Sequence, residues 1–185
     1  INQHFGTYEP VFLAELWRHG ARAAAKNSFK QDYVDKVGAG LIQPNGIRMH
    51  YVLGRQIQTT WKDNIFAGIM KNSDFEIHSS EYQRTILSAE SHAYGLFPPG
   101  SGLKVTNLDK DPKIALPSYK DINIDVTALG QNALPSGYRP IPVAVSLVTN
   151  DNLFMKGMKF NCKAAEDKLE ATSKKAFADN KALLD

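Results

Sequence analysis

The order of apolar and polar segments constrains the fold of this chain more than any other feature. A short apolar run at residues 11–17 leads into a polar loop at 18–22, and residues 21–26 favour a helical turn. The same order recurs where residues 75–77 alternate like a strand and residues 81–94 follow as a helix. Strand, loop and helix occurring twice predict an α/β fold with a mostly parallel sheet flanked by helices.

A long amphipathic helix separates these two units. It follows a turn at Asn45 and Gly46 and extends to about Phe66. Apolar side chains recur along it at helical spacing, at Ile47, Tyr51, Leu53, Ile57, Trp61 and Ile65.

The helix over residues 81–94 has a start signal and a stop signal. Ser80 stands three residues before Gln83, which is a capping-box pattern. Gly95 and Pro98 follow the last apolar positions and end the helix.

The rest of the chain is less regular. Residues 98–147 contain seven prolines and few clear periods, which predicts an irregular excursion within a single domain over residues 1–185. Residues 160–184 are rich in alanine, lysine and acidic residues and predict an amphipathic helix. One of its faces would carry Ala165, Leu169, Thr172, Ala176 and Phe177.

Composition and charge bound the class of protein. The chain is 43% hydrophobic and 10% aromatic, which is ordinary for a globular protein. Its 22 basic and 19 acidic residues are mixed along the sequence, so nucleic-acid binding is not indicated. No apolar run approaches the roughly 20 residues that cross a bilayer, so we expect no transmembrane segment.

The sequence leaves the cellular compartment open. The chain begins at Ile1 without a charged and then apolar leader, which fits a removed signal peptide. Its single cysteine, Cys162, cannot form an internal disulfide. It also contains no Asn-x-Ser/Thr acceptor for N-glycosylation.

The loop at residues 18–22 has the residue types of a phosphate site. Arg18 and Arg22 are permanent cations whose planar forks of N–H donors match phosphate oxygens. His19 between them can attack phosphorus and carry the phosphoryl group. Gly20 allows a close approach that a β-carbon would obstruct. We therefore expect a phosphate site with a histidine nucleophile at this loop.

Arg84 is the fourth candidate residue, near the start of the second predicted helix. Ligands of parallel sheets lie outside the carboxyl ends of the strands, close to helix N-termini. If the two predicted strands are parallel neighbours, Arg84 converges with Arg18, His19 and Arg22.

These segments resemble the motifs of the histidine acid phosphatases, the branch of the histidine phosphatase superfamily that includes acid phosphatases and phytases. Residues 18–22 resemble the family signature, and residues 84–89 followed by 95–99 resemble its second block at about the expected separation. Further similar segments are 41–46 leading into 53–55, then 139–143 and 161–163. The resemblance covers nearly the whole chain, but only the N-terminal part of a family member.

The resemblance implies a role for each of these residues. His19 would be the nucleophile that becomes phosphohistidine, while Arg18, Arg22 and Arg84 would bind the phosphate oxygens. His78 stands where the family often has another basic residue, so it is a further candidate phosphate ligand; an exposed or structural histidine is the alternative. The family needs no metal and no cofactor, and its substrate is a phosphomonoester.

The chain departs from the family pattern in two places. Ala24 stands where the family has a proline, which would leave the loop less rigid. The family's later His-Asp pair, which supplies the general acid, has no match up to Asp185, so the segment alone would be a poor enzyme or none. A further polypeptide could carry that part. In the family, a cysteine at the place of Cys162 tends to pair with one nearer the C-terminus.

Three functions are compatible with these residues. The first is an acid phosphatase of a secreted, lysosomal or vacuolar compartment, acting on phytate or on general phosphomonoesters. The second is a non-catalytic phosphatase-like protein used for binding or assembly. The third, a transferase of the mutase-like branch, is disfavoured because that branch has an acidic residue where Ala21 stands.

Other polar residues have structural interpretations. Glu15 within the apolar run is expected to pair with a buried arginine. His50 and His92 on the two predicted helices are expected to be packing or capping residues. The five scattered histidines do not predict a metal site.

Overall fold

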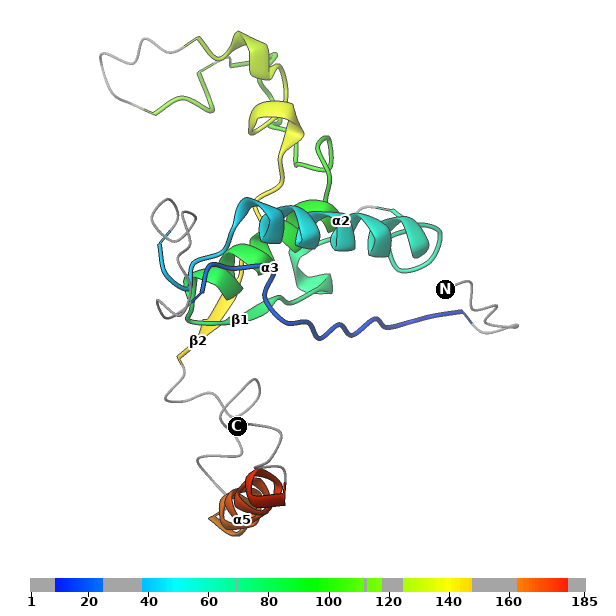
Figure 1. Cartoon of the computed structure of the whole chain (residues 1–185). Helices are drawn as coiled ribbons and strands as arrows, with labels where there is room; N and C mark the ends of the chain where they lie inside the picture. The colour runs from blue at the N-terminus through cyan, green and yellow to red at the C-terminus, as the bar shows by residue number, and fades with distance from the viewer. Residues whose placement is uncertain are drawn as a thin grey trace.

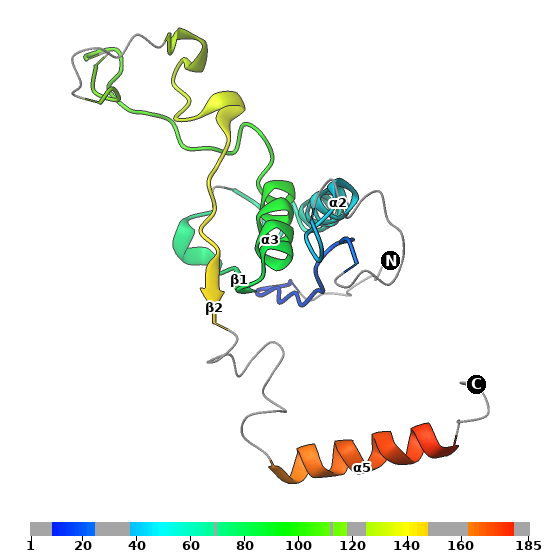
Figure 2. The ribbon, with the colours of Figure 1, turned by 60° about the vertical axis from the view of Figure 1, so that its left-hand side comes forward.

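The computed structural model describes residues 9–24, 38–68, 70–111, 113–117, 125–147 and 163–179. Its α-helices in these ranges are α2 (Pro44–Thr60), α3 (Gln83–Leu96) and α5 (Lys163–Asp179), and its strands are β1 (His78–Ser80) and β2 (Ala144–Ser146). Short 3-10 turns occur at Asn72–Asp74, Thr127–Leu129 and Pro135–Gly137. α2 and α3 pack side by side, with the β1–β2 pair beside α3 (Figures 1 and 2).

β1 and β2 form a parallel pair in which His78 lies beside Ala144. The pair confirms the predicted α/β class with parallel strands. β1 begins three residues later than the strand predicted at 75–77. Residues 75–77 lead directly into β1, and Ile77 among them is buried in the core. Around Ile77 the core contains Ala89, Ala93, Phe75, Ile141 and Val143.

The irregular excursion predicted at residues 98–147 contains, among its described residues, the short strand β2 and two 3-10 turns. No period in the sequence predicts β2, because a strand of three residues is too short for an alternation to show. The described parts of the remainder lead away from the helix pair after α3 and return toward it before β2, as both views show (Figures 1 and 2). At its return, Arg139 donates to the Met70 carbonyl and to Asn72, both at 2.8 Å.

Two glycines allow α2 and α3 to approach closely. A β-carbon on Gly54 of α2 would lie 2.2 Å from the His92 carbonyl oxygen, and one on Gly95 of α3 would lie 2.3 Å from that of Tyr51. Backbone atoms therefore meet where larger side chains would separate the helices. Gly95 was predicted to stop α3, but it lies inside the helix and makes this contact.

The buried face of α2 differs from the apolar face that the sequence predicts. Its buried residues are Gly46, His50 and Gly54, whereas Ile47 and Leu53 are 40% and 39% exposed. Close backbone contacts explain two of the three buried positions, since Gly46 packs on the backbone of Gly20 and Ala21 and Gly54 packs on α3, where larger side chains would not fit.

The ends of both helices also differ from prediction. α2 ends at Thr60 rather than near Phe66, and the amide of Phe66 donates to the Trp61 carbonyl in the turn that follows. Asp and Asn in that turn favour local backbone bonds over helix. The predicted capping box does not form, because Gln83 accepts a hydrogen bond from the Ile42 amide at 3.1 Å. Tyr82 is the N-cap and makes no side-chain cap.

The apolar run at 11–17 is not the buried strand that the sequence predicts. Among the described residues it has no strand partner, and Val11, Phe12 and Leu16 are 92%, 80% and 85% exposed. Alternate side chains from residue 13 to 19 are half-buried. This alternation is typical of an extended segment packed on one face, whereas a buried strand needs a layer on both.

Two further predicted helices are only partly described. Residues 21–24 form no helical turn, since Arg22 makes an antiparallel bridge with Ile42; residues 25 and 26 lie outside the described residues. α5 confirms a helix within residues 160–184, and Leu169 on its predicted face is 54% exposed. In the described part of the chain, no helix combines the length and apolar character needed to cross a membrane.

Candidate phosphate site

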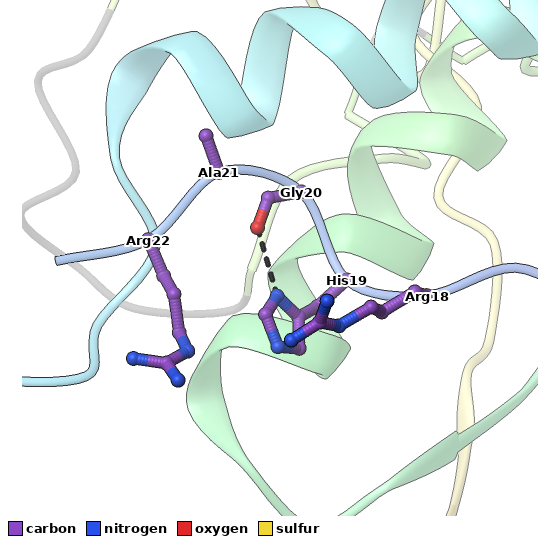
Figure 3. Close-up of a pocket in the computed structure, with 5 residues that line it drawn as sticks. All are labelled: Arg18, His19, Gly20, Ala21 and Arg22. Atoms are coloured by element: carbon purple, nitrogen blue, oxygen red, sulfur yellow. Dashed lines mark hydrogen bonds between the residues drawn. The ribbon is translucent and has the colours of Figure 1, made fainter. Parts of the chain in front are cut away.

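The loop at residues 18–22 forms an open pocket of about 290 Å³. The pocket is lined by Arg18, His19, Gly20, Ala21 and Arg22. Figure 3 shows the side chains of His19 and Arg22 on the same side of the loop, opposite the side chain of Ala21. The loop therefore presents its histidine and its second arginine to one space.

Two close contacts position this loop on the start of α2. A β-carbon on Gly20 would lie 2.4 Å from the Gly46 carbonyl oxygen, and one on Gly46 would lie 2.2 Å from that of Ala21. After the loop, the amide of Ala23 donates to the Leu41 carbonyl at 2.9 Å. Gly20 therefore allows a close approach, as the sequence predicts, and the group that it approaches is the backbone of Gly46.

The hydrogen bond of His19 determines which ring nitrogen is free. Its Nδ1 lies 2.8 Å from the Gly20 carbonyl oxygen, which can only accept, so Nδ1 carries the proton. In the neutral ring, Nε2 then has an unprotonated lone pair. Nε2 is the nitrogen that can attack an electrophile.

Burial lowers the pKa of His19 below its usual value, although the hydrogen bond to Gly20 opposes this shift. The positive charges of Arg84, Arg18 and Arg22 lower the pKa further, in that order. The charge of Arg84 thus acts on His19 across 65 positions of sequence (84 − 19), although Arg84 is not among the residues that line the pocket. Both effects favour the neutral, nucleophilic ring.

Arg22 and Arg84 each have a buried Nε atom without a hydrogen-bond partner among the described residues. A terminal nitrogen of Arg22 donates to the Ala23 carbonyl at 2.8 Å, and the Arg84 guanidinium lies 4.2 Å from the centroid of the Tyr82 ring. An unpaired buried N–H is costly, and a charge-assisted bond to an anion would remove that cost.

His78 lies at the start of β1 with its side chain 42% exposed. Its Nε2 is 3.1 Å from a carboxylate oxygen of Glu76. It does not line the pocket at residues 18–22. Its predicted role as a phosphate ligand stays a prediction.

Glu15 pairs with a histidine and not with the buried arginine predicted for it. Its Oε2 lies 3.1 Å from Nε2 of His92, a side chain that is 0% exposed. The His92 ring also stacks on Trp17 at 4.2 Å between centroids. His92 is thus a packing residue, as the sequence predicts, and it anchors the segment that leads into the loop.

His50 and Ser88 bond the backbone of the two residues that flank His19, and the sequence did not predict either contact. Nε2 of His50 donates to the Arg18 carbonyl at 3.0 Å, and the Ser88 hydroxyl accepts the Gly20 amide at 3.0 Å. Burial lowers the pKa of His50, and the bond to Arg18 opposes the shift. The one signal for Ser88 was its position one helical turn after Arg84.

No group of three or more histidine, cysteine or carboxylate side chains within the described ranges is arranged to bind a metal ion. Cys162 lies outside those ranges.

We expect the His19 ring to titrate at a lower pH than a free histidine, because burial and three cations disfavour its charged form. The midpoint can be measured by NMR from the ring Cε1 proton. Arg84→Gln should move the midpoint upward, since it removes the arginine charge with the largest effect on the pKa of His19. Arg55→Gln, whose parent side chain bonds Gln58, is the control and should leave it unchanged. A His19 midpoint that is the same in the parent chain and in Arg84→Gln would contradict the convergence of these residues.

Comparison with known families defines the class of this protein. Residues 24–183 match the histidine phosphatase superfamily (branch 2), and the chain belongs to that family. The match begins just after the loop at 18–22, so the loop's assignment rests on its own residues and geometry.

Acid phosphatases are among the similar curated proteins. Over 91 residues the chain is 30% identical to rat lysosomal acid phosphatase and 29% to the human one, with 48% of this chain and 21% of each relative covered. It is 28% identical to bovine prostatic acid phosphatase over 100 residues, with 52% and 25% covered. The chain thus spans about a fifth to a quarter of the length of these relatives.

Proposed function

We propose that this chain carries the nucleophile and the phosphate-binding arginines of an acid phosphatase that works through phosphohistidine. The observation that carries the proposal is the Nδ1 hydrogen bond of His19 to Gly20, which leaves Nε2 unprotonated beside three arginine charges. Family membership and the acid phosphatases among the relatives support it.

In the proposed reaction, Nε2 of His19 attacks the phosphorus of a phosphomonoester. A bond forms between Nε2 and phosphorus, and the bond from phosphorus to the alcohol oxygen breaks with its electron pair leaving on that oxygen. Arg18, Arg22 and Arg84 stabilise the negative charge on the three other oxygens. Water then attacks phosphorus, and the bond between Nε2 and phosphorus breaks with its electron pair returning to Nε2. The proton that the water loses balances the one that the alcoholate takes up, so the products are the alcohol, inorganic phosphate and free His19.

The unpaired Nε–H groups of Arg22 and Arg84 fit this role. Phosphoryl transfer depends mainly on positioning and on electrostatic stabilisation, and one well-placed donor is typically worth about a hundredfold in rate. A phosphate ester between the two guanidinium groups would supply acceptors to donors that the protein leaves without them.

Trapping the covalent intermediate tests the proposal. We expect the 185-residue chain, mixed with radiolabelled p-nitrophenyl phosphate, to become labelled on His19. The nitrophenolate leaving group needs no proton, so this step is independent of a general acid. The label should be stable in base and lost in acid, as a phosphoramidate is. Label on a serine, or none, would reject the proposed function.

No observation favours the non-catalytic alternative. The names of the lysosomal and prostatic relatives support a further proposal, that the protein acts in a lysosomal or secreted setting. The choice between phytate and smaller phosphomonoesters is open to a direct comparison of their labelling rates.

A further inference from the structure

The peptide groups on both sides of His19 are bonded to different helices. Before it, the Arg18 carbonyl accepts from Nε2 of His50 on α2 at 3.0 Å. After it, the Gly20 amide donates to the hydroxyl of Ser88 on α3 at 3.0 Å. The backbone of His19 is therefore fixed from two directions, by residues 32 and 68 positions away in the sequence.

Ser88 makes a second bond that concerns Arg84. Its hydroxyl donates to the Arg84 carbonyl oxygen at 2.6 Å while accepting from Gly20. The side chain is 1% exposed. A hydroxyl has one proton to donate, and here that proton goes to the residue that carries the distant arginine. One oxygen atom thus joins the nucleophile loop to Arg84.

A serine inside a helix often bonds the carbonyl four residues earlier, without any further role. Ser91 shows this arrangement one turn later, since it donates to the Leu87 carbonyl at 2.5 Å. Ser88 differs from it by the bond to Gly20 and by its full burial. Ser91 therefore provides a control for the bond that the two serines share.

We propose that Ser88 is a positioning residue that sets the placement of His19 relative to Arg84. This inference rests on the proposed phosphatase function, because it assigns Ser88 to the same site. Phosphoryl transfer needs the attacking nitrogen and the charge-stabilising guanidinium in a fixed relation, and a misplacement of about 1 Å can cost on the order of a hundredfold in rate. Without the hydroxyl, the Gly20 amide loses its acceptor and the loop loses its tie to α3.

A double-variant cycle in the full 185-residue chain tests this role. The readout is the single-turnover rate of His19 labelling by p-nitrophenyl phosphate. Ser88→Ala should lower this rate by about tenfold or more, whereas Ser91→Ala should change it by less than about twofold. In an Arg84→Ala background, Ser88→Ala should cost less than about threefold, because the partner to be positioned is gone.

Equal losses in both backgrounds would show a merely structural role and overturn the inference, as would a loss no larger than that of Ser91→Ala. Ser88→Cys retains a weak donor and acceptor of similar size and should fall between serine and alanine. Thermal unfolding of each variant verifies that the chain is folded.

If the unsubstituted chain forms no phosphohistidine, the proposed function fails, and a second measurement decides whether Ser88 positions the loop. Amide hydrogen exchange at Gly20 should then be faster in Ser88→Ala by about tenfold or more, because its acceptor is lost. The Ala23 amide, bonded to Leu41, is the internal reference and should not change. Unchanged exchange at Gly20 would overturn the inference.

Discussion

His19→Ala is expected to abolish phosphoryl transfer by this protein. The substitution removes Nε2, the nitrogen with the free lone pair, and no other histidine lines the pocket. Losing a covalent nucleophile typically costs at least about 10⁴-fold in rate. The measurement is the rate of nitrophenolate release at acidic pH, together with the amount of labelled protein.

The fold should survive this change, because within the described part of the chain the His19 ring bonds the carbonyl of the next residue and no distant element. Thermal unfolding close to that of the parent chain is the control. His78→Ala in the same assay tests the predicted role of His78. KM should rise if the substitution removes a phosphate ligand, and it should stay unchanged if His78 bonds only Glu76. Retained turnover in His19→Ala would reject the nucleophile.

Gly46→Ala is expected to disrupt the site from outside the pocket. The added β-carbon would lie 2.2 Å from the Ala21 carbonyl oxygen and 2.6 Å from its amide nitrogen, and both are backbone atoms that cannot rotate away. The loop at 18–22 would have to move off α2. We expect a loss of about 1–3 kcal/mol in the free energy of unfolding, as in other overpacked sites. Phosphate binding at the loop should weaken with it.

The sign of the stability change in Gly46→Ala separates the loop contact from the intrinsic helix preference of alanine. In an open helix, replacing glycine by alanine stabilises by roughly 1 kcal/mol, because glycine has the greater backbone entropy to lose. Destabilisation would therefore arise from the contact with the loop alone. Asn45→Ala, at the exposed neighbouring position of α2, is the control and should leave phosphate binding intact. A Gly46→Ala chain of raised stability would disprove the close contact. Denaturant unfolding and phosphate titration measure the two quantities.

The sequence predicts α2 and α3 and their approximate ranges, since helical periodicity is local. It fails at the N-terminal run, where six apolar residues out of seven suggest burial but Leu16 is 85% exposed. The pattern shows that a segment can be buried and does not show which layers cover it. The buried face of α2 was missed for a related reason: Gly46 and Gly54 matter because of the backbone atoms that they meet.

Candidate residues were easier to find than their arrangement. Arg18, His19 and Arg22 are adjacent in the sequence, and their chemistry alone points to phosphate. The approach of Arg84 was expected from two parallel neighbouring strands. In the structure, however, the run before His19 pairs with no described strand, and Arg84 reaches His19 through the packing of the loop on α3. The influence of Arg84 on His19 therefore has a different structural basis from the pair of parallel strands that the sequence suggested, and its role as a phosphate ligand stays a prediction.

The sequence by itself determined the residue types of the candidate site, a histidine among arginines in a chain of α/β order, because residue type and local periodicity need no knowledge of distant contacts. The tertiary structure alone decided which distant residues hold these side chains in place. The tether of Gly20 to Ser88 spans 68 positions, and the partner of Glu15 proved to be His92. Such contacts depend on which backbones pack together, and here glycines placed on two helices govern that packing.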